Sequence, residues 1–424
     1  MPNMGSDNGF TGQGSFAETL AHATQEHFEQ LDRALHSLWK LGRNVILVWA
    51  PQTTGIEVLV LPNYEIASLA NQGNQKPYDP QRTVQDRRMR EERSYIDTVI
   101  AGPKFVDLER LSEISKELGV EAQHIDLPFT PGEDVGLKMI DALVRRYSLS
   151  YVEDRAVALF DIVNFSLYSP LEQVTQLNSL AYSVNSAHSK LLQRKIDINF
   201  ARSTTGDGFY IWNRDRSLQA NVNLYHFMHL VLADNAIARS KAAQRNAVPL
   251  LRTCFDIGGH YEFYQSEGLS PTVYSYIVGE VTIGLARMID KAIPGQIMVG
   301  DFLVDMPDAD AGELTEFSSV EFIERTQETL ANLKGLVLSD DEIDSIQCYL
   351  TGQRSSDGAF DIRHYLLQDK HGLTRHIYNA KVNIYRRQAD PIYLGVQDKD
   401  LAELQIGEPK FVKPSKFVNP SVAE

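Results

Sequence analysis

The sequence predicts a mixed α/β (α+β) protein with two domains, and three observations support this prediction. The chain has 424 residues, which is long for one domain because domains average about 150 residues. Hydrophobic residues make up 43% of the chain and charged residues 23%, as in ordinary globular proteins. Short β-rich runs alternate with longer stretches whose apolar residues recur at helical spacing.

The first domain is expected over residues 19–150 as a small α/β module. Residues 1–18 are rich in Gly, Asn and Ser and predict a flexible lead. Leucines and Phe28 recur at helical spacing and predict a helix over residues 16–41. The runs NVILVWAP and GIEVLVLP predict two strands around a Gln-Thr-Thr-Gly turn.

The rest of the first domain is predicted to be helical after an exposed loop. The loop is expected over residues 72–93, which are polar and contain Pro77 and Pro80. Helical patterns return at residues 94–118 and 134–147. The module carries no chemical motif, so its role stays open, with regulation as one candidate.

The second domain is expected over residues 151–390 and begins with the order β-α-β-β-α-β. The apolar run AVALFDIV suits a buried strand, and a helical pattern follows at 169–194. KIDINFARS and GFYIWN predict two strands joined by a tight Thr-Thr-Gly-Asp hairpin. A helical stretch at 218–245 precedes the strand candidate PLLRTCFDIG. This order is that of the ferredoxin-like split βαβ arrangement.

Further elements follow the predicted β-α-β-β-α-β unit. A helix is expected at 280–292, followed by the short strand QIMVG, an acidic loop in DMPDADAGELTE and a helix at 319–335. Residues 364–387 predict a terminal hairpin with Lys370, His371 and Gly372 at its turn. Residues 391–424 are expected to form a C-terminal tail.

Composition excludes several partners and locations. The net charge of −15 repels polyanions, so nucleic acid is not an expected partner. Cys254 and Cys348 are too few for a disulfide framework or a four-thiolate metal site and fit a reducing, cytoplasmic compartment. The start of the chain lacks a signal-peptide pattern, and no run of 18 or more apolar residues predicts a membrane span.

Two carboxylates are predicted to converge at one end of the second domain's sheet. Asp161 closes a buried strand, and Asp207 lies at a hairpin turn 46 residues later. Because the first strand and the hairpin are neighbours in this order, the pair suits divalent metal ions on a nucleoside triphosphate. The turn 162–166 leads into a helix whose backbone N–H groups would face the same phosphates. Alternatively, Asp161 caps the helix and Asp207 serves the turn.

Four segments, in this order, resemble the class III nucleotide cyclase catalytic domain: FDIVNFS, TTGDGFYIW, LRTCFDIGG and YIVGEVTIGLARMIDKAIPGQIMVGDF. The resemblance covers residues 155–303, and its most specific parts are the two aspartate motifs and AxPGQIMV. It implies that Asp161, Asp207 and the Ile162 backbone hold two Mg²⁺ or Mn²⁺ ions per site, and that Arg287 stabilises the transition state.

The resemblance also implies a reaction and an assembly. A nucleoside triphosphate would be converted to a 3′,5′-cyclic nucleotide and pyrophosphate, as a second messenger. In this family the arginine and the base-contacting residues of a site come from the other subunit, so a homodimer with shared active sites is implied. Substrate contacts are expected from five residues: Phe165, Ser166, Ser203, Tyr276 and Lys370. A solvated turn lysine is an equal alternative for Lys370.

Three positions depart from the family's pattern. Ser203 stands where adenylate cyclases usually have Lys and guanylate cyclases Glu, and Tyr276 where adenylate enzymes often have Asp. Similar departures occur in a divergent bacterial type, the antiphage pyrimidine cyclases, so CTP and UTP stay open beside ATP and GTP. Ile283 replaces the usual Asn and can donate no hydrogen bond.

Ile283 therefore keeps a second function class open: a catalytically weak or inactive, cyclase-like nucleotide-binding or regulatory protein. A polymerase-like palm is a third candidate, disfavoured by the A-x-P-G-Q-I-M-V segment and the negative charge. His226 and His229 lie at i, i+3 in a helical pattern and could share a metal ion. With no third ligand in view, a hydrogen-bonded structural pair is the favoured interpretation.

Overall fold

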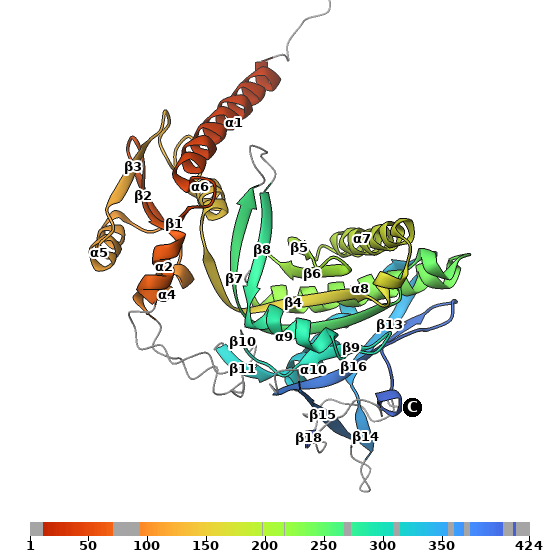
Figure 1. Cartoon of the computed structure of the whole chain (residues 1–424). Helices are drawn as coiled ribbons and strands as arrows, with labels where there is room; N and C mark the ends of the chain where they lie inside the picture. Colours follow the sequence, from red (N-terminus) through yellow and green to blue (C-terminus); the bar gives the residue numbers. More distant parts are fainter. Residues whose placement is uncertain are drawn as a thin grey trace, which may run out of the picture. The chain divides into compact units, whose positions relative to one another are not determined.

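The computed structural model describes residues 12–70, 94–196, 198–215, 217–266, 273–307, 314–354, 360–368, 374–401 and 410–412. The chain divides into two compact units (Figure 1). The first consists of residues 1–75, 91–151 and 261–276, and the second of residues 76–90, 152–260 and 277–424. The buried apolar clusters of the two units are separate, so each unit has its own cores.

The first unit is built on a three-stranded antiparallel sheet. Its strands lie in the order β1 (Asn44–Gln52), β2 (Gly55–Pro62), β3 (Ala122–Asp126). Helices α1 (Gly12–Trp39) and α6 (Leu137–Val144), with the short turn η1 (Arg145–Tyr147), pack their apolar residues on one face. The other face is covered by α2 (Asn63–Ala70), α4 (Tyr95–Ala101) and α5 (Leu108–Leu118).

Most predictions for the first unit are confirmed. The two apolar runs form the β1–β2 hairpin as expected. The pattern at 94–118 forms two helices instead of one, because Gly102 and Pro103 end α4. Strand β3 was not predicted, since four of its five side chains are exposed and no apolar alternation marks it. Residues 1–11 of the expected lead and the expected loop at 72–93 lie outside the described residues.

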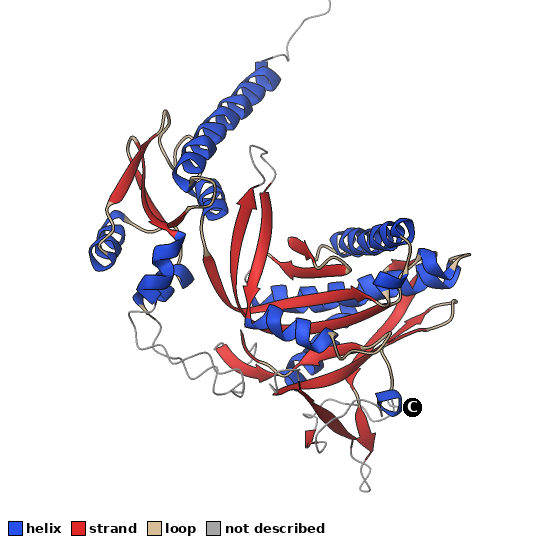
Figure 2. Cartoon of the chain, in the orientation of Figure 1, coloured by secondary structure: helices blue, strands red, loops and turns tan. Residues whose placement is uncertain are grey.

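The second unit contains the predicted ferredoxin-like arrangement (Figure 2). Its elements are β4 (Ser150–Ile162), the turn η2 (Phe165–Leu167), α7 (Pro170–Gln193), β5 (Phe200–Thr204), β6 (Gly208–Asn213), α8 (Leu218–Lys241), η3 (Arg245–Ala247) and β7 (Leu251–Ser266). The strands lie in the order β7-β4-β6-β5, with β6 antiparallel to both β4 and β5. The fold class predicted from the element order is confirmed.

Helices cover both faces of this sheet. Helices α7, α8 and α10 (Ser319–Leu330), continued by η4 (Ala331–Leu333), pack on one face, and α9 (Glu280–Ile289) packs on the other. Along β4, Ala158 and Phe160 face α7 and α8, whereas Val157 and Leu159 face α9. Burial on both faces explains the continuous apolar run of this strand. By the same alternation, Asp161 points to the α9 face.

The sheet continues beyond the ferredoxin-like strands. Its order in the described residues is β12-β13-β16-β9-β7-β4-β6-β5, with the remaining strands attached at its sides. The added strands are β8 (Val273–Gly279), β9 (Ile297–Gly300), β12 (Val337–Leu338), β13 (Asp341–Leu350), β14 (Gly352–Arg354), β15 (Phe360–Gln368) and β16 (Thr374–Arg386). The β15–β16 pair confirms the predicted terminal hairpin, and its turn, with Lys370, lies outside the described residues.

Two predictions for the second unit are wrong in part. Strands β10 (Leu303–Pro307) and β11 (Leu314–Ser318) pair where an acidic loop was expected, and residues 308–313 between them are not described. The expected tail contains β17 (Ile392–Leu394), η5 (Asp398–Leu401) and β18 (Lys410–Val412). Strand β17 pairs with β16 and buries Ile392 and Leu394 in the core, and the three-residue strand β18 pairs with β15.

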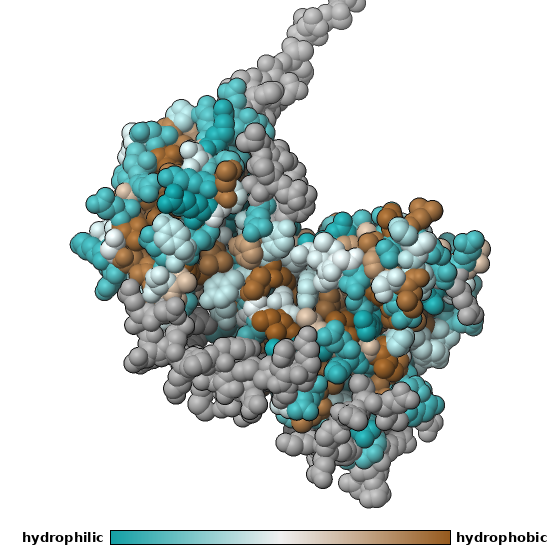
Figure 3. All heavy atoms as spheres, viewed as in Figure 1, coloured by the Kyte–Doolittle hydropathy of each residue, from teal (hydrophilic) through white to brown (hydrophobic). Residues whose placement is uncertain are grey.

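Apolar side chains lie exposed over α7 and the turn before it (Figure 3). Four of them are Leu167, Leu171, Val174 and Tyr182, with exposed fractions from 55% to 80%. No described helix has both the length and the apolar character that a membrane crossing requires.

Candidate functional site

Strand pairing brings the two predicted metal-binding aspartates together. Asp161 is the last but one residue of β4 and lies opposite Gly208, the first residue of β6. Asp207 immediately precedes β6, and its carbonyl oxygen accepts a hydrogen bond from the Ile162 N–H at 3.0 Å. The Asp207 carboxylate lies near enough to Asp161 to contribute to the raised pKa of the Asp161 carboxyl group. The predicted convergence of Asp161 and Asp207 is therefore confirmed.

The hairpin that carries Asp207 is held in place by two glycines and two threonines. A Cβ atom on Gly208 would lie 1.9 Å from the Phe160 carbonyl oxygen, so only glycine allows β6 to approach β4 this closely. Gly206 has a φ of +101°, in the region that favours glycine. The Thr204 hydroxyl accepts a hydrogen bond from the Gly206 N–H, and the Thr205 hydroxyl donates one to the Asp207 carboxylate at 3.1 Å.

Asp161 is buried and has a cationic partner that the sequence analysis did not single out. Its carboxylate accepts a hydrogen bond from Arg252 Nε on β7 at 2.5 Å. Burial raises the pKa of Asp161; the Arg252 guanidinium opposes this shift and the Asp207 carboxylate adds to it. Arg252 also donates to the Ala292 carbonyl oxygen, in the turn after α9, at 3.4 Å. Arg252 thus offsets the repulsion between the negative charges of Asp161 and Asp207.

The donor set fits a divalent oxygen-seeking cation. Two carboxylates converge, and within the described part of the chain no group of three or more His, Cys, Asp or Glu side chains is arranged to hold a metal ion. Mg²⁺ usually keeps waters and is held by one or two carboxylates together with substrate phosphates. Asp161 and Asp207 could hold such an ion with substrate present, and Arg252 would then share the Asp161 carboxylate with it.

The segment after Asp161 forms a turn before the helix. Phe165 is half-buried against the core under α7 and α8, while Ser166 is exposed. Ser169 caps α7 through a reciprocal pair of contacts with Glu172. The alternative that Asp161 caps this helix is therefore wrong, because the cap lies eight residues further on. The Ile162 side chain is buried, so only its backbone can take part in a site.

Helix α9 presents Arg287 and Ile283 one turn apart. Val281, Leu285 and Met288 pack into the core below, whereas Ile283 is 42% exposed and Arg287 is half-buried. Ile283 is thus an apolar side chain at the surface, and the position offers no hydrogen-bond donor beside Arg287.

The remaining predicted site residues are spread over several elements. Ser203 is half-buried in β5 and pairs in register with Tyr210 of β6. Tyr276 is in β8 and stacks on Phe263 of β7, with ring centroids 5.7 Å apart. Ser203 belongs to the second unit and Tyr276 to the first. Lys370 lies outside the described residues.

His226 and His229 are both buried in α8, and the structural interpretation holds for the first of them. His226 Nε2 is 3.0 Å from the Thr329 hydroxyl and 3.4 Å from the Thr326 carbonyl oxygen. Neither ring nitrogen of His229 has a hydrogen-bond partner among the described residues, so the expectation of a fully hydrogen-bonded pair is wrong for His229. Burial lowers the pKa of His226 to about 4 and that of His229 to about 3.

Sequence reasoning missed two residues on β7, Arg252 and Asp256. Both lie in the quoted segment LRTCFDIGG, four residues apart. A strand period of two places them on one face with Cys254, which packs below α9. The alternation in the sequence could have shown that Arg252 and Asp256 share a face of the strand. It could not show their ion-pair partners, which lie on β4 and β16, far away along the chain.

No protein-family model and no curated protein matches this chain. Solved structures similar to it include nucleotide cyclase domains. The guanylate cyclase domain of RhGC from Catenaria anguillulae, in complex with GTP, is 12% identical, covers 56% of this chain and 100% of its own, and has a TM-score of 0.32. The adenylyl cyclase CyaB from P. aeruginosa is 12% identical over 57% of this chain and 98% of its own, with a TM-score of 0.32. At such low scores these similarities carry no argument about activity.

Proposed function

We propose that the second unit is a nucleotide cyclase, a phosphorus–oxygen lyase that makes a 3′,5′-cyclic nucleotide for signalling. The observation that carries the proposal is the convergence of Asp161 and Asp207 at the β4–β6 pair. The motifs around these two residues, and the segment that contains Arg287, add the sequence resemblance to class III cyclases. The ferredoxin-like order of the strands agrees with it.

The proposed reaction is intramolecular. The ribose 3′-oxygen forms a bond to the α-phosphorus, the bond from that phosphorus to the bridging oxygen breaks, pyrophosphate leaves and the hydroxyl proton passes to solvent. Asp161, Asp207 and the Ile162 backbone would hold two Mg²⁺ or Mn²⁺ ions, which supply Lewis-acid activation and charge neutralisation. Arg287 would stabilise the charge on the α-phosphate with a permanently charged planar guanidinium. Arg252 would keep Asp161 ionised and oriented.

The assembly that fits this chemistry is a homodimer. In the proposed arrangement Asp161 and Asp207 of one chain and Arg287 of its partner complete one site, and two equivalent sites form about a two-fold axis. Phe165 and Ser166 of the turn after β4 and Lys370 of the β15–β16 hairpin would contact the triphosphate.

Ser203 and Tyr276 are the proposed contacts of the base. A serine hydroxyl both donates and accepts a hydrogen bond, so Ser203 is a weak selector between purines. Tyr276 already has one face against Phe263, and its bulk favours a smaller ring. We therefore expect weak selectivity between ATP and GTP, or a preference for CTP or UTP.

The test is an assay of the purified chain with Mn²⁺ and each of the four nucleoside triphosphates, with products separated by mass. A cyclic mononucleotide and pyrophosphate in equal amounts are expected. Asp161→Asn and Asp207→Asn keep the side-chain volume and remove a metal-binding charge, so each is expected to lower the rate at least about 100-fold while the chain stays folded. Unchanged turnover in either variant would refute the metal assignment.

A second function is favoured by one observation, the exposed apolar side chain of Ile283 beside Arg287. A cyclase-like protein that binds nucleotide without turnover would retain the aspartates and need no donor at this position. Binding of a nucleoside triphosphate in the presence of Mn²⁺, without any cyclic product, would favour this function. Restored turnover in Ile283→Asn would show that the missing donor is the cause.

A further inference from the structure

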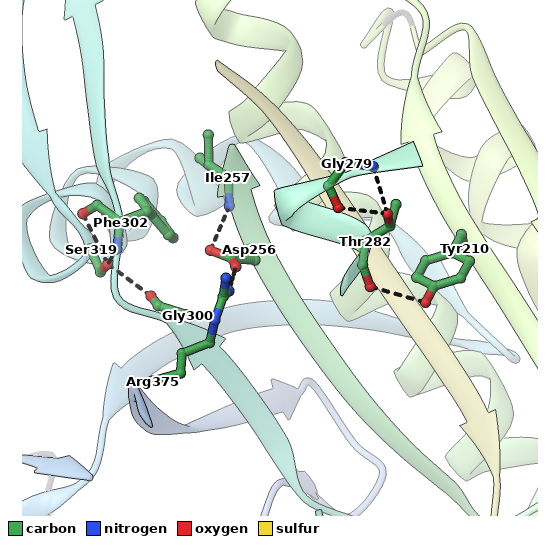
Figure 4. A network of polar contacts seen from close by, with 9 residues as sticks. All are labelled: Tyr210, Asp256, Ile257, Gly279, Thr282, Gly300, Phe302, Ser319 and Arg375. Atoms are coloured by element: carbon green, nitrogen blue, oxygen red, sulfur yellow. Dashed lines mark hydrogen bonds and ion pairs between the residues drawn. The ribbon is translucent and has the colours of Figure 1, made fainter. Parts of the chain in front are cut away.

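Helix α9 is anchored to the sheet at its beginning by hydrogen bonds (Figure 4). The Gly279 N–H donates to the Thr282 hydroxyl at 3.1 Å, and this hydroxyl donates to the Gly279 carbonyl oxygen at 3.0 Å. The Tyr210 hydroxyl of β6 donates to the Thr282 carbonyl oxygen at 3.2 Å. These contacts fix the first turn of the helix that carries Arg287.

The middle of α9 rests on an arginine from a distant strand. A Cβ atom on Gly284 would lie 1.9 Å from Nη1 of Arg375, the second residue of β16, and 2.3 Å from its Cζ. The guanidinium therefore fills the space that any other residue would need at position 284. Gly284 and Arg287 are three residues apart, so this contact lies within one turn of the proposed transition-state arginine.

A buried carboxylate holds the guanidinium in place. Arg375 Nη1 lies 2.5 Å from the Asp256 carboxylate on β7, and the two side chains are 15% and 5% exposed. The Asp256 carboxylate also accepts a hydrogen bond from the Ile257 N–H at 3.0 Å. On its other side, a Cβ atom on Gly300 of β9 would lie 2.3 Å from an Asp256 carboxylate oxygen. The ion pair is thus enclosed between two glycines, one in α9 and one in β9.

We propose that the Asp256–Arg375 ion pair positions α9, and with it Arg287, for catalysis. The proposal rests on the proposed cyclase function and names Arg375 and Asp256 as positioning residues that need not touch the substrate. A buried, hydrogen-bonded ion pair permits few alternative geometries, since either charge left alone in this environment is unfavourable. A helix held at Thr282 and Gly284 keeps Arg287 in one place, which transition-state stabilisation requires.

Two variants disturb the contact without leaving Asp256 unpaired. Arg375→Lys keeps the positive charge but loses the planar guanidinium that packs against Gly284. Gly284→Ala leaves both charges in place and adds the Cβ atom that has no room; alanine is also the better helix former, so helix propensity does not explain a loss. The matched control is Arg363→Lys, which alters an arginine on the neighbouring strand β15 whose ion-pair partner is Asp398.

The readouts separate positioning from general stability. We expect Arg375→Lys and Gly284→Ala to lower kcat about 10- to 100-fold with KM changed less than about threefold, because a displacement of about 1 Å can cost 100-fold. When Arg375→Lys or Gly284→Ala is combined with Arg287→Ala, kcat should be less than about twofold lower than in Arg287→Ala alone, because the side chain that would be positioned is absent. Arg363→Lys should retain at least about half of the activity.

Hydrogen exchange gives a test that needs no turnover. Backbone amides of α9 should exchange faster in Arg375→Lys than in the native chain, while those of α8 stay unchanged. Unchanged exchange in α9 would overturn the anchoring of the helix, whether or not the protein is a cyclase. Two outcomes would overturn the proposal that the ion pair positions Arg287. One is faster exchange in α9 with an unchanged kcat. The other is faster exchange with a loss of kcat that is as large in the Arg287→Ala background as in the native chain. If the native chain forms no cyclic product, the proposed function is refuted. The exchange measurement then still tests whether the ion pair anchors α9.

Discussion

Burial determines the chemistry of single polar residues in the core of the second unit. His229 and Tyr225 lie on the same helix with ring centroids 4.3 Å apart. The Tyr225 hydroxyl and both His229 ring nitrogens lack hydrogen-bond partners among the described residues. Burial disfavours the charged histidine, and His226 nearby adds to the lowering of the His229 pKa to about 3.

This burial predicts a loss of stability in acid. In the unfolded chain a histidine takes up a proton near its ordinary pKa of about 6.5, whereas His226 and His229 stay neutral in the folded chain until about pH 4 and 3. The free energy of unfolding should therefore fall as the pH drops from about 6.5 towards 4, by up to about 1.4 kcal/mol per pH unit for each histidine.

His229→Phe tests the assignment, because it removes one of the two titrating groups and keeps an aromatic ring. Denaturant unfolding should be measured between pH 7 and 4.5. The free energy of unfolding should fall less steeply with decreasing pH in the variant, because unfolding of the variant takes up about one proton fewer. The same slope in both proteins would mean that His229 is not the group that titrates on unfolding.

At the level of elements, the approach of β6 to β4 creates the candidate metal site. The pairing of Asp161 with Gly208 places Asp207 beside the end of β4. Since the Cβ atom of any other residue at position 208 would meet the Phe160 carbonyl oxygen, this register depends on glycine.

Gly208→Ala is expected to separate the two strands at the site. The chain should lose about 1–3 kcal/mol of unfolding free energy, as in other overpacked positions, and should bind Mn²⁺ more weakly because the two carboxylates move apart. Gly258→Ala in β7 is the control, since its Cβ atom would meet Val281 Cβ at an ordinary 3.6 Å. Equal losses of stability and of Mn²⁺ affinity in both variants would contradict the expectation.

For the whole molecule, the two units share strands. Strands β4, β7 and β8 each contribute residues to both compact units. The outer part of the β7–β8 pair has partners inside the first unit, where the Tyr261 hydroxyl is 3.4 Å from the Asp97 carboxylate of α4. Because β8 leads directly into α9, the first unit is joined to the helix of Arg287 by three residues after Tyr276.

The proposed dimer makes a prediction of its own. Asp161→Ala chains and Arg287→Ala chains should each retain only a small, measurable residual activity, and an equimolar mixture should recover about a quarter of the native activity. Half of the randomly formed dimers are then mixed, and one of the two sites in each mixed dimer is intact. If mixed dimers form and the mixture stays as inactive as its parts, active sites shared between subunits are excluded.

The sequence alone determined the β-α-β-β-α-β order, because strand and helix periods are local properties of the chain. It also predicted that Asp161 and Asp207 converge as candidate metal ligands, since their motifs lie at strand ends where side chains of neighbouring strands come together. Strands β3, β12 and β18 were not predicted because they are short or carry exposed side chains, so pairing with a neighbour rather than an apolar pattern defines them. In β13 a register shift between Ile343 and Ser345 interrupts the apolar alternation.

Only the tertiary structure decided which charges meet. Arg252 reaches Asp161, which lies 91 residues away along the chain, and Arg375 reaches Asp256 over 119 residues. No local pattern encodes such partners, since they depend on the order of strands in the sheet and on the glycines that leave room between them. The sequence predicted the candidate site residues, and the packing of the sheet and of α9 decided which distant residues contact them.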